Sequence, residues 1–300
     1  MSQRSIRRRL VRRPVSLIEA MAARLPALPA LGEAADGYLV TSVPLPGVGA
    51  LLAAHPDLLP FVRQRYRRRY ADLTGSYEAW LHGLSGRSRS TLKRKLKRFA
   101  QRSGGSVDLR RYTRPGDMAE FHRLARGISA LSYQERRLSC GLPDGPEMRA
   151  HLHRLAERDA VRGWILFLDG APVSYLYAPA EGDVLMYEHL GYDPAAADWS
   201  PGIVLQCAAM RQLFEERRFR LFDFTEGDGR HKALFATGDV PCADLLLLRP
   251  TTANRAARSI RRVKPTSSWP TSSTMPRTAG CTSTSPSCRF SKRSRTACRT

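Results

Sequence analysis

The strongest pattern of apolar positions along the chain lies between residues 162 and 232. A compact apolar run at 164–168 is followed by the turn pair Asp169-Gly170 and by a second run at 172–178, which predicts a β-hairpin. A further turn leads into the alternating stretch 184–190. Together these runs predict a three-stranded antiparallel meander.

A helix and a short strand follow the meander. Residues 203–217 have helical spacing, the pair Pro201-Gly202 precedes them, and residues 221–224 form a short apolar run that ends in a polar string. This order predicts a helix N-terminus and several ionisable groups at the sheet edge where open α/β sheets hold their ligands. The apolar positions on one face of the helix are Ile203, Cys207, Met210 and Phe214.

The chain before the meander is predicted to be mainly helical. Helical spacing extends over 51–70, and Ser76 is placed to cap a short helix that carries Tyr77 and Trp80. Residues 107–112 alternate like a strand. The other predicted elements are helices at 90–102, 117–127 and 145–158, a helical turn at 231–236 and a last strand at 243–249.

The net charge of +22 is unevenly distributed. Residues 1–102 carry 20 Lys or Arg against 6 Asp or Glu, whereas the middle of the chain is nearly neutral. Residues 87–102 hold eight basic residues and no acid on an amphipathic helix. We interpret this basic face as solvated, with a phosphate-binding surface as the alternative. The neutral middle and the scarcity of aromatic residues on the basic helix disfavour a dedicated nucleic-acid-binding protein.

Cysteine spacing and apolar run length exclude several classes of protein. The six cysteines form no CxxC pair and no cluster with histidines, so the sequence predicts neither a metal site nor a disulfide framework. No apolar run reaches the roughly 18 residues of a membrane span. The arginine-rich segment 4–13 lacks the apolar core of a secretory signal and is interpreted as a frayed basic arm, with a targeting segment as the alternative. We therefore expect a cytoplasmic protein.

Composition divides the chain into three parts. Residues 1–74 are expected to be a basic, helical and partly ordered region, and residues 75–250 an α/β domain with a mixed, mostly antiparallel twisted sheet flanked by helices. Residues 251–300 are expected to be a basic tail, because from residue 264 on 17 of 37 residues are Ser or Thr and none is acidic. Such a stretch buries too little apolar surface to offset chain entropy. It is interpreted as disordered or, preferably, as the product of a reading-frame shift.

The order strand, two helices, meander, helix, strand, helix, strand resembles the GNAT acyltransferase fold. More narrowly, the Pro-Gly helix entrance and the Asp, Gly and Lys string resemble the FemAB-like and CelD-like branch. The basic stretch 85–102 resembles the segment that precedes the catalytic domain in that branch. The glycine-rich loop typical of GNAT enzymes is absent. The residues that carry the resemblance are Pro201, Gly202, Asp223, Gly227, Lys232 and Phe235.

The resemblance implies transfer of an acyl group from acetyl-CoA or another acyl-CoA to an amine. The acceptor would be a sugar, an amino acid or a precursor of the bacterial cell envelope or of polysaccharide. Relatives in the Fem branch use aminoacyl-tRNA as donor, so a tRNA-dependent transferase is one alternative, and a non-catalytic binding protein is another. A helix N-terminus attracts the CoA pyrophosphate through unpaired N–H groups and the helix dipole. The residues expected to bind the donor are Pro201, Gly202, Ile203, Val204 and Lys232.

The third strand of the meander supplies candidates for proton transfer. Regular alternation would place Glu188 on one face with Leu190, and His189 on the other face with Tyr187. A carboxylate among apolar neighbours has a raised pKa, which suits a general base. We therefore expect Glu188 to be the base, with His189 as the alternative.

Two further residues are candidates on the same grounds. Asp223 closes the next strand between two phenylalanines, and is expected to act as a base or as the partner of Lys232. Tyr192, like Tyr187, is a candidate proton donor to the leaving thiolate.

Overall fold

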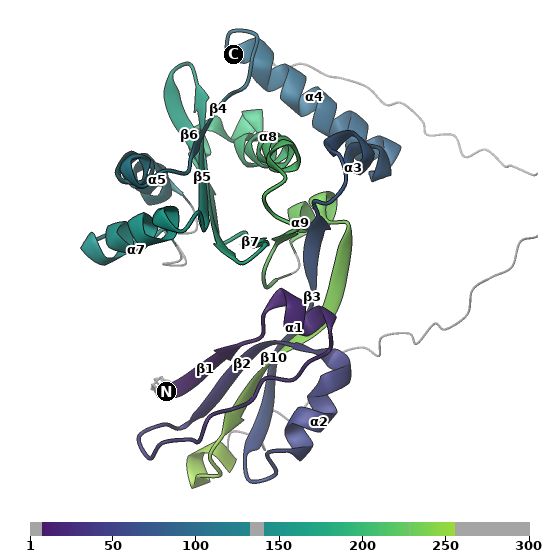
Figure 1. Ribbon diagram of the computed structural model, residues 1–300, viewed down its shortest axis with the longest axis vertical. Helices are drawn as coiled ribbons and strands as arrows, with labels where there is room; N and C mark the ends of the chain where they lie inside the picture. Colours follow the sequence, from purple (N-terminus) through teal and green to yellow (C-terminus); the bar gives the residue numbers. More distant parts are fainter. Residues whose placement is uncertain (1–7, 133–140, 228, 256–300) are drawn as a thin grey trace, which may run out of the picture. The chain divides into compact units, whose positions relative to one another are not determined.

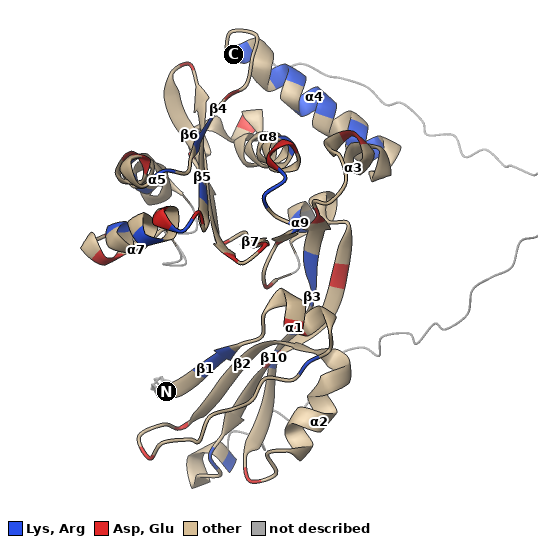
Figure 2. Cartoon of the chain, viewed as in Figure 1, with Lys and Arg blue, Asp and Glu red and all other residues tan. Residues whose placement is uncertain are grey.

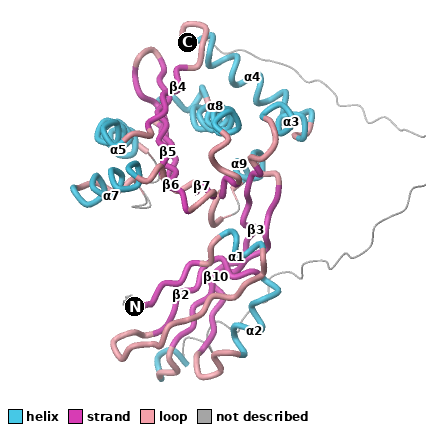
Figure 3. Tube along the Cα trace, viewed as in Figure 1, coloured by secondary structure: helices cyan, strands magenta, loops and turns pink. Residues whose placement is uncertain are grey.

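A computed structural model describes residues 8–132, 141–227 and 229–255 of the chain. All of them belong to one compact unit, Met1–Ser259. The predicted disordered or frame-shifted tail lies outside the described residues from residue 256 on. Figure 1 shows the helices and strands by label, and Figure 3 separates them by colour.

The predicted meander is confirmed. β5 (Val161–Leu168) and β6 (Ala171–Glu181) form an antiparallel hairpin, and the third strand is divided into β7 (Val184–Met186) and β8 (His189–Tyr192), which both pair antiparallel with β6. β4 (Asp108–Tyr112) pairs antiparallel with β5. Because helices cover both faces, β5 is buried along its whole length.

The helices lie on opposite faces of the meander. α5 (Met118–Leu131) and α7 (Pro146–Glu157) cover one face, and α8 (Pro201–Glu216) covers the other (Figure 1). Alternate residues of the strands fill the two cores, so Trp164 faces α8 and Ile165 faces α5. α3 (Tyr77–Gly83) and α4 (Gly86–Arg102) pack against α8.

A bulge interrupts the third strand of the meander. Ala180 pairs with Leu185, and Tyr177 pairs with His189, so two residues of β6 lie opposite the three residues from Met186 to Glu188. The additional residue reverses the alternation of side chains beyond it. The prediction of unbroken alternation over 184–190 is therefore wrong.

Residues 51–70 do not form the predicted helix. The chain makes a short helix, α2 (Val48–Ala53), and then the 14-residue strand β3 (Leu59–Asp72). β3 pairs antiparallel with β10 (Gly238–Leu248) along most of its length, and its end pairs with β9 (Leu221–Asp223). Both partners come far later in the sequence, so long-range pairing overrides the local helical spacing.

Strands from the N-terminal region complete the sheet. β1 (Leu10–Pro14), which lies partly in the segment predicted as a frayed arm, pairs parallel with β2 (Gly37–Pro44). β2 pairs antiparallel with β10, which gives the order β1-β2-β10-β3-β9-β7-β6-β5-β4. The remaining short elements are α1 (Leu17–Met21), η1 (Leu45–Gly47), η2 (Pro115–Asp117), η3 (Pro194–Trp199) and α9 (Arg230–Phe235).

Candidate active site

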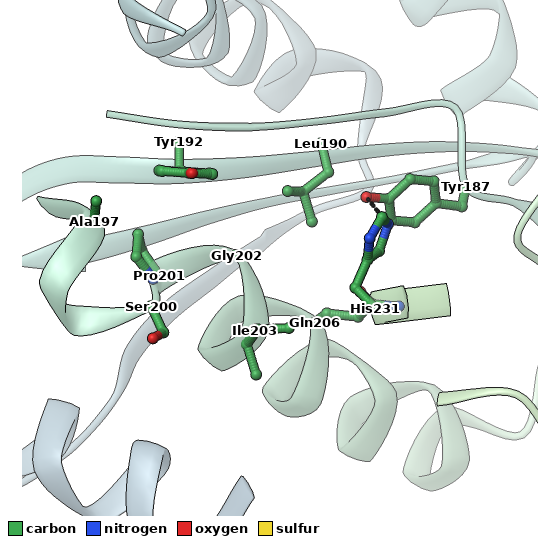
Figure 4. Close-up of a pocket in the computed structure, with 10 residues that line it drawn as sticks. All are labelled: Tyr187, Leu190, Tyr192, Ala197, Ser200, Pro201, Gly202, Ile203, Gln206 and His231. Atoms are coloured by element: carbon green, nitrogen blue, oxygen red, sulfur yellow. Dashed lines mark hydrogen bonds between the residues drawn. The ribbon is translucent and has the colours of Figure 1, made fainter. Parts of the chain in front are cut away.

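A cavity opens where β8 separates from β9. β7 and β9 pair in parallel only as far as Met186 and Asp223, and β8 then continues along β6. The first turns of α8 lie across the gap, and a cavity of about 350 Å³ lies between them and β8 (Figure 4). The residues that line it are Tyr187, Leu190, Tyr192, Ala197, Ser200, Pro201, Gly202, Ile203, Gln206 and His231.

Tyr187 and His231 meet at one end of this cavity. The Tyr187 hydroxyl lies 3.5 Å from His231 Nε2. The backbone of Tyr187 is fixed on both sides, because its N–H donates to the Asp223 carbonyl at 2.8 Å and its carbonyl accepts from Thr225 Oγ1 at 3.1 Å. Burial raises the pKa of Tyr187, and burial together with the charge of Lys232 lowers the pKa of His231. Near pH 7 the tyrosine is thus a proton donor and the histidine a neutral acceptor.

The N-terminus of α8 offers few free N–H groups to an anion. Ser200 precedes the helix in a left-handed conformation, with φ of 54°, and Pro201 has no N–H. The N–H groups of Ile203 and Val204 both donate to the Ser200 carbonyl, at 3.0 and 3.1 Å. Within the described part of the chain, this leaves Gly202 as the first-turn residue whose N–H has no acceptor.

Cations of α4 lie beside this helix end. Lys95 Nζ donates to Ser200 Oγ, and the Arg98 guanidinium lies over the Trp199 ring, 4.8 Å from its centroid. Figure 2 shows Lys and Arg positions repeated along α4. A phosphate at the α8 N-terminus would therefore meet both the helix dipole and these cations.

Gln206 lies in the second turn of α8 and also lines the cavity. Its side chain is 1% exposed, and its Nε2 has no acceptor among the described residues. An unpaired buried donor costs about 1–3 kcal/mol, so the great majority of buried polar groups in folded proteins are paired.

Residues 86–233 match the sequence profile of the acetyltransferase (GNAT) domain. This chain carries a GNAT domain. The family resemblance predicted from the sequence is confirmed at this level, and every residue that lines the cavity lies within the matched range. No curated protein sequence matches the chain.

Solved structures share the fold of the GNAT domain at low sequence identity. The C-terminal (DUF2156) domain assigned to a lysylphosphatidylglycerol synthetase of Agrobacterium fabrum has a TM-score of 0.51 at 14% identity, covering 75% of this chain and 71% of that one. L-PGS from Bacillus licheniformis has a TM-score of 0.50 at 13% identity, with coverages of 75% and 71%. FemX has a TM-score of 0.49 at 12% identity, with coverages of 76% and 75%. At these identities the first two structures show a likeness of fold alone.

Five residues predicted from the sequence line the cavity of the GNAT domain, namely Tyr187, Tyr192, Pro201, Gly202 and Ile203. Val204, expected beside them, is fully buried in the first turn of α8 and does not line the cavity. Lys232 does not line it either, but its Nζ donates to the Glu226 carbonyl and lies 5.7 Å from the Tyr187 ring centroid.

The two predicted bases on the meander do not line the cavity, and the bulge places His189 on the face opposite Leu185. His189 stacks on Tyr177, on the α5 side of the sheet, with ring centroids 6.1 Å apart. The Glu188 side chain is 50% exposed, and burial raises its pKa. Burial, and then the charge of Glu188, raise the pKa of Tyr177, which places the carboxylate near that ring.

Asp223 is held in a buried ion pair. Its Oδ2 lies 2.5 Å from Arg68 Nη2, and its Oδ1 accepts from the Thr225 N–H at 2.8 Å. Arg68 also donates to the Val15 carbonyl at 2.6 Å. Asp223 and Leu221 face away from α8, whereas Phe222 between them packs toward it. The ion partner of Asp223 is therefore Arg68 rather than the predicted Lys232.

Sequence reasoning missed His231 and Gln206 as site residues. The sequence did carry a signal for Gln206, which occupies the buried stripe of the predicted helix, three residues after Ile203 and four before Met210. A polar residue at such a position needs a partner. His231 lies in the polar string after β9, where only the fold shows that its ring reaches Tyr187.

Two features are absent from the described residues. These residues contain no group of three or more His, Cys, Asp or Glu side chains that could hold a metal ion. Nor does this part of the chain include a helix that is both long and apolar enough to cross a bilayer.

Proposed function

We propose that this GNAT domain transfers an acyl group from a CoA thioester to the amine of a small molecule, such as an amino sugar, an amino acid or a cell-envelope or polysaccharide precursor. The observation that carries the proposal is the cavity between β8 and α8. At one end it offers the N–H of Gly202, beside Lys95, to a phosphate-bearing donor. At the other end it holds a phenol and a neutral imidazole (Figure 4).

In this proposal Tyr187 and His231 move the protons. His231 accepts a proton from the amine as its nitrogen attacks the acyl carbon and the C–N bond forms. Tyr187 donates its proton to the sulfur as the C–S bond breaks. A proton then passes from His231 Nε2 to the phenolate across the 3.5 Å between them, which restores both groups. The products are an amide and a free thiol.

A second donor, the aminoacyl ester of a tRNA, is favoured by the basic helix α4, whose Lys95 reaches the cavity at Ser200. The raised pKa of Tyr187 also fits an ester better. A phenol whose pKa lies above its usual value of about 10 is a weaker acid than a thiol, whose pKa is about 8.5, so it gives its proton to a thiolate unfavourably. The alkoxide released from an ester is a stronger base than a thiolate and takes that proton more readily. One solved structure with a similar fold is a domain assigned to a lysylphosphatidylglycerol synthetase, a name that indicates a lysyl group as the group transferred by that protein.

Thermal shift measurements test the donor. Acetyl-CoA at 100 times its Kd is expected to stabilise the protein by about 2.7 kcal/mol. Gly202→Trp is expected to abolish this shift, because a Cβ there already lies 3.1 Å from Leu190 Cδ2, and a larger side chain fills the cavity. Gly49→Trp is the matched control, since a Cβ at this exposed position meets no atom within 4 Å.

The same experiment separates the alternatives. Stabilisation by aminoacyl-tRNA but not by acetyl-CoA, with binding that weakens steeply as salt increases, would indicate that the donor is the tRNA ester and not the CoA thioester. Binding of either donor without transfer to any amine would leave a non-catalytic binding protein. The absence of binding and of transfer with both donors would refute the proposal.

A further inference from the structure

Gln206 is a buried polar residue in the cavity wall, and neither the packing of the fold nor the proton transfer by Tyr187 and His231 accounts for it. Its neighbours along α8, Leu205 and Cys207, are buried apolar residues, and Gln206 itself is 1% exposed. Its Nε2 nevertheless finds no acceptor in the described part of the protein. In Figure 4 the Gln206 side chain extends from α8 toward the end of the cavity that holds Tyr187 and His231.

We propose that Gln206 Nε2 donates a hydrogen bond to the carbonyl oxygen of the acyl group that is being transferred. This inference rests on the proposed acyl transfer and adds to it a residue that binds the reacting atoms. It holds for a thioester and for an ester donor alike, because the acyl carbonyl is the acceptor that both bring into the cavity.

The backbone of the bulge supports this assignment. An oxyanion needs donors that are not already engaged. The N–H of Tyr187 donates to the Asp223 carbonyl at 2.8 Å, and the N–H of Glu188 donates to the Tyr177 carbonyl at 3.2 Å. The N–H groups of Tyr187 and Glu188 are therefore occupied within the sheet, whereas Gln206 lines the same cavity from α8 and its Nε2 has no acceptor among the described residues.

The role in the reaction follows from electron movement. As the amine nitrogen bonds to the acyl carbon, the carbonyl π electrons move onto oxygen, and the Gln206 N–H donates to the resulting oxyanion. When the carbonyl re-forms, the bond from carbon to sulfur, or to the ester oxygen, breaks. The leaving atom takes the proton of Tyr187, and Gln206 itself is unchanged.

The test compares Gln206→Leu with Gln101→Leu, a control on the exposed surface of α4. Transfer from acetyl-CoA and from lysyl-tRNA to glucosamine and to lysine is measured together with the melting temperature. Gln206→Leu is expected to lower kcat/KM about 100-fold, as loss of one oxyanion donor does. The same change removes an unpaired buried amide, so the melting temperature is expected to stay equal or to rise. Gln101→Leu is expected to change neither quantity.

A merely structural glutamine would give the opposite pattern, with activity and melting temperature falling together, and that result would overturn the assignment. So would wild-type kcat/KM in Gln206→Leu. If the wild-type protein neither transfers an acyl group nor is stabilised by either donor, the acyl transfer itself is wrong, and the role of Gln206 falls with it. If wild type transfers and only the Gln206 prediction is contradicted, the proposed function stands.

Discussion

Two polar clusters lie on opposite faces of the sheet at β9, and they differ in how their groups are paired. On the face away from α8, the Asp223 carboxylate is fully buried and is bonded by Arg68 and by the Thr225 N–H. On the α8 face, the Tyr187 hydroxyl and His231 make one long contact of 3.5 Å, and Gln206 Nε2 has no acceptor in the described chain. The first cluster is complete, because its groups are paired within the protein, whereas the second is open, because Gln206 Nε2 is unpaired among the described residues.

This difference shows why the most conspicuous ionisable residue was a poor guide to the site. Asp223 stands out in the sequence because it is a carboxylate between phenylalanines. In the fold its oxygens accept from Arg68, which joins β9 to β3, and they do not line the cavity beside α8. Groups whose hydrogen-bonding capacity remains open inside a cavity are better candidates for binding and catalysis.

The largest expected effect, on the free energy of unfolding, comes from breaking the ion pair of the complete cluster. Arg68→Met leaves the Asp223 carboxylate buried without its ion partner, which is expected to lower the free energy of unfolding by about 3–5 kcal/mol. Urea denaturation measures the change. Arg67→Met is the matched control, because this neighbouring arginine is 42% exposed in its pair with Asp239, and exposed pairs contribute about 0–1 kcal/mol. Equal losses in the two variants would show that the buried pair has no special weight.

The next effect concerns the open cluster and its pH dependence. His231→Gln is expected to lower kcat/KM about 100-fold, as loss of a general base does. Because the pKa of His231 is lowered by burial and by Lys232, the wild-type rate is expected to rise with pH, with a midpoint below about 6.5, as the imidazole loses its proton. This rise is the acid limb of the pH profile, and the variant should lose it.

The control for that experiment is His189→Gln, which changes a histidine on the α5 face of the same sheet, where it stacks on Tyr177. It should keep both the rate and the acid limb. An acid limb that persists in His231→Gln and disappears in His189→Gln would reverse the assignment of the base.

The smallest expected effect tests the residue that the sequence favoured. Glu188→Gln changes a side chain that is 50% exposed and does not line the cavity. The free energy of unfolding is expected to change by less than about 0.5 kcal/mol, as for most surface substitutions, and kcat/KM to stay at the wild-type value. A large loss of activity with unchanged stability would restore Glu188 as the base.

Local patterns predicted the elements whose signals are local. The apolar runs and the Asp169-Gly170 turn gave the hairpin of β5 and β6, and Ser76 caps α3 as expected by accepting from the Ala79 N–H at 3.1 Å. β3 was mistaken for a helix because the pairing that makes it a strand comes from β9 and β10, which local spacing does not reveal.

The lining of the cavity, too, was predictable only in part. The Pro201-Gly202 entrance to α8 located one wall of the cavity, and Tyr192 located part of the other. Tyr187, also a candidate from the sequence, lies at the opposite end, but its contact with His231 was not predictable. A single additional residue at the bulge between β7 and β8 decides which side chains beyond it face α8. A shift of one residue moves every following side chain to the other face of a strand.

The order of the elements around the meander and the amphipathic helices could be predicted from the sequence, because both follow from periodicity and turn chemistry over short stretches. The family of the domain came from a resemblance, which the matching sequence profile confirms. In contrast, the fold sets which polar groups find a hydrogen-bond partner. Arg68 meets Asp223, and Tyr187 meets His231, across long distances in the chain, while Gln206 is left without an acceptor in the part that the structure describes. Hydrogen-bond satisfaction depends on where atoms lie in space, so it is a property of the fold rather than of any segment.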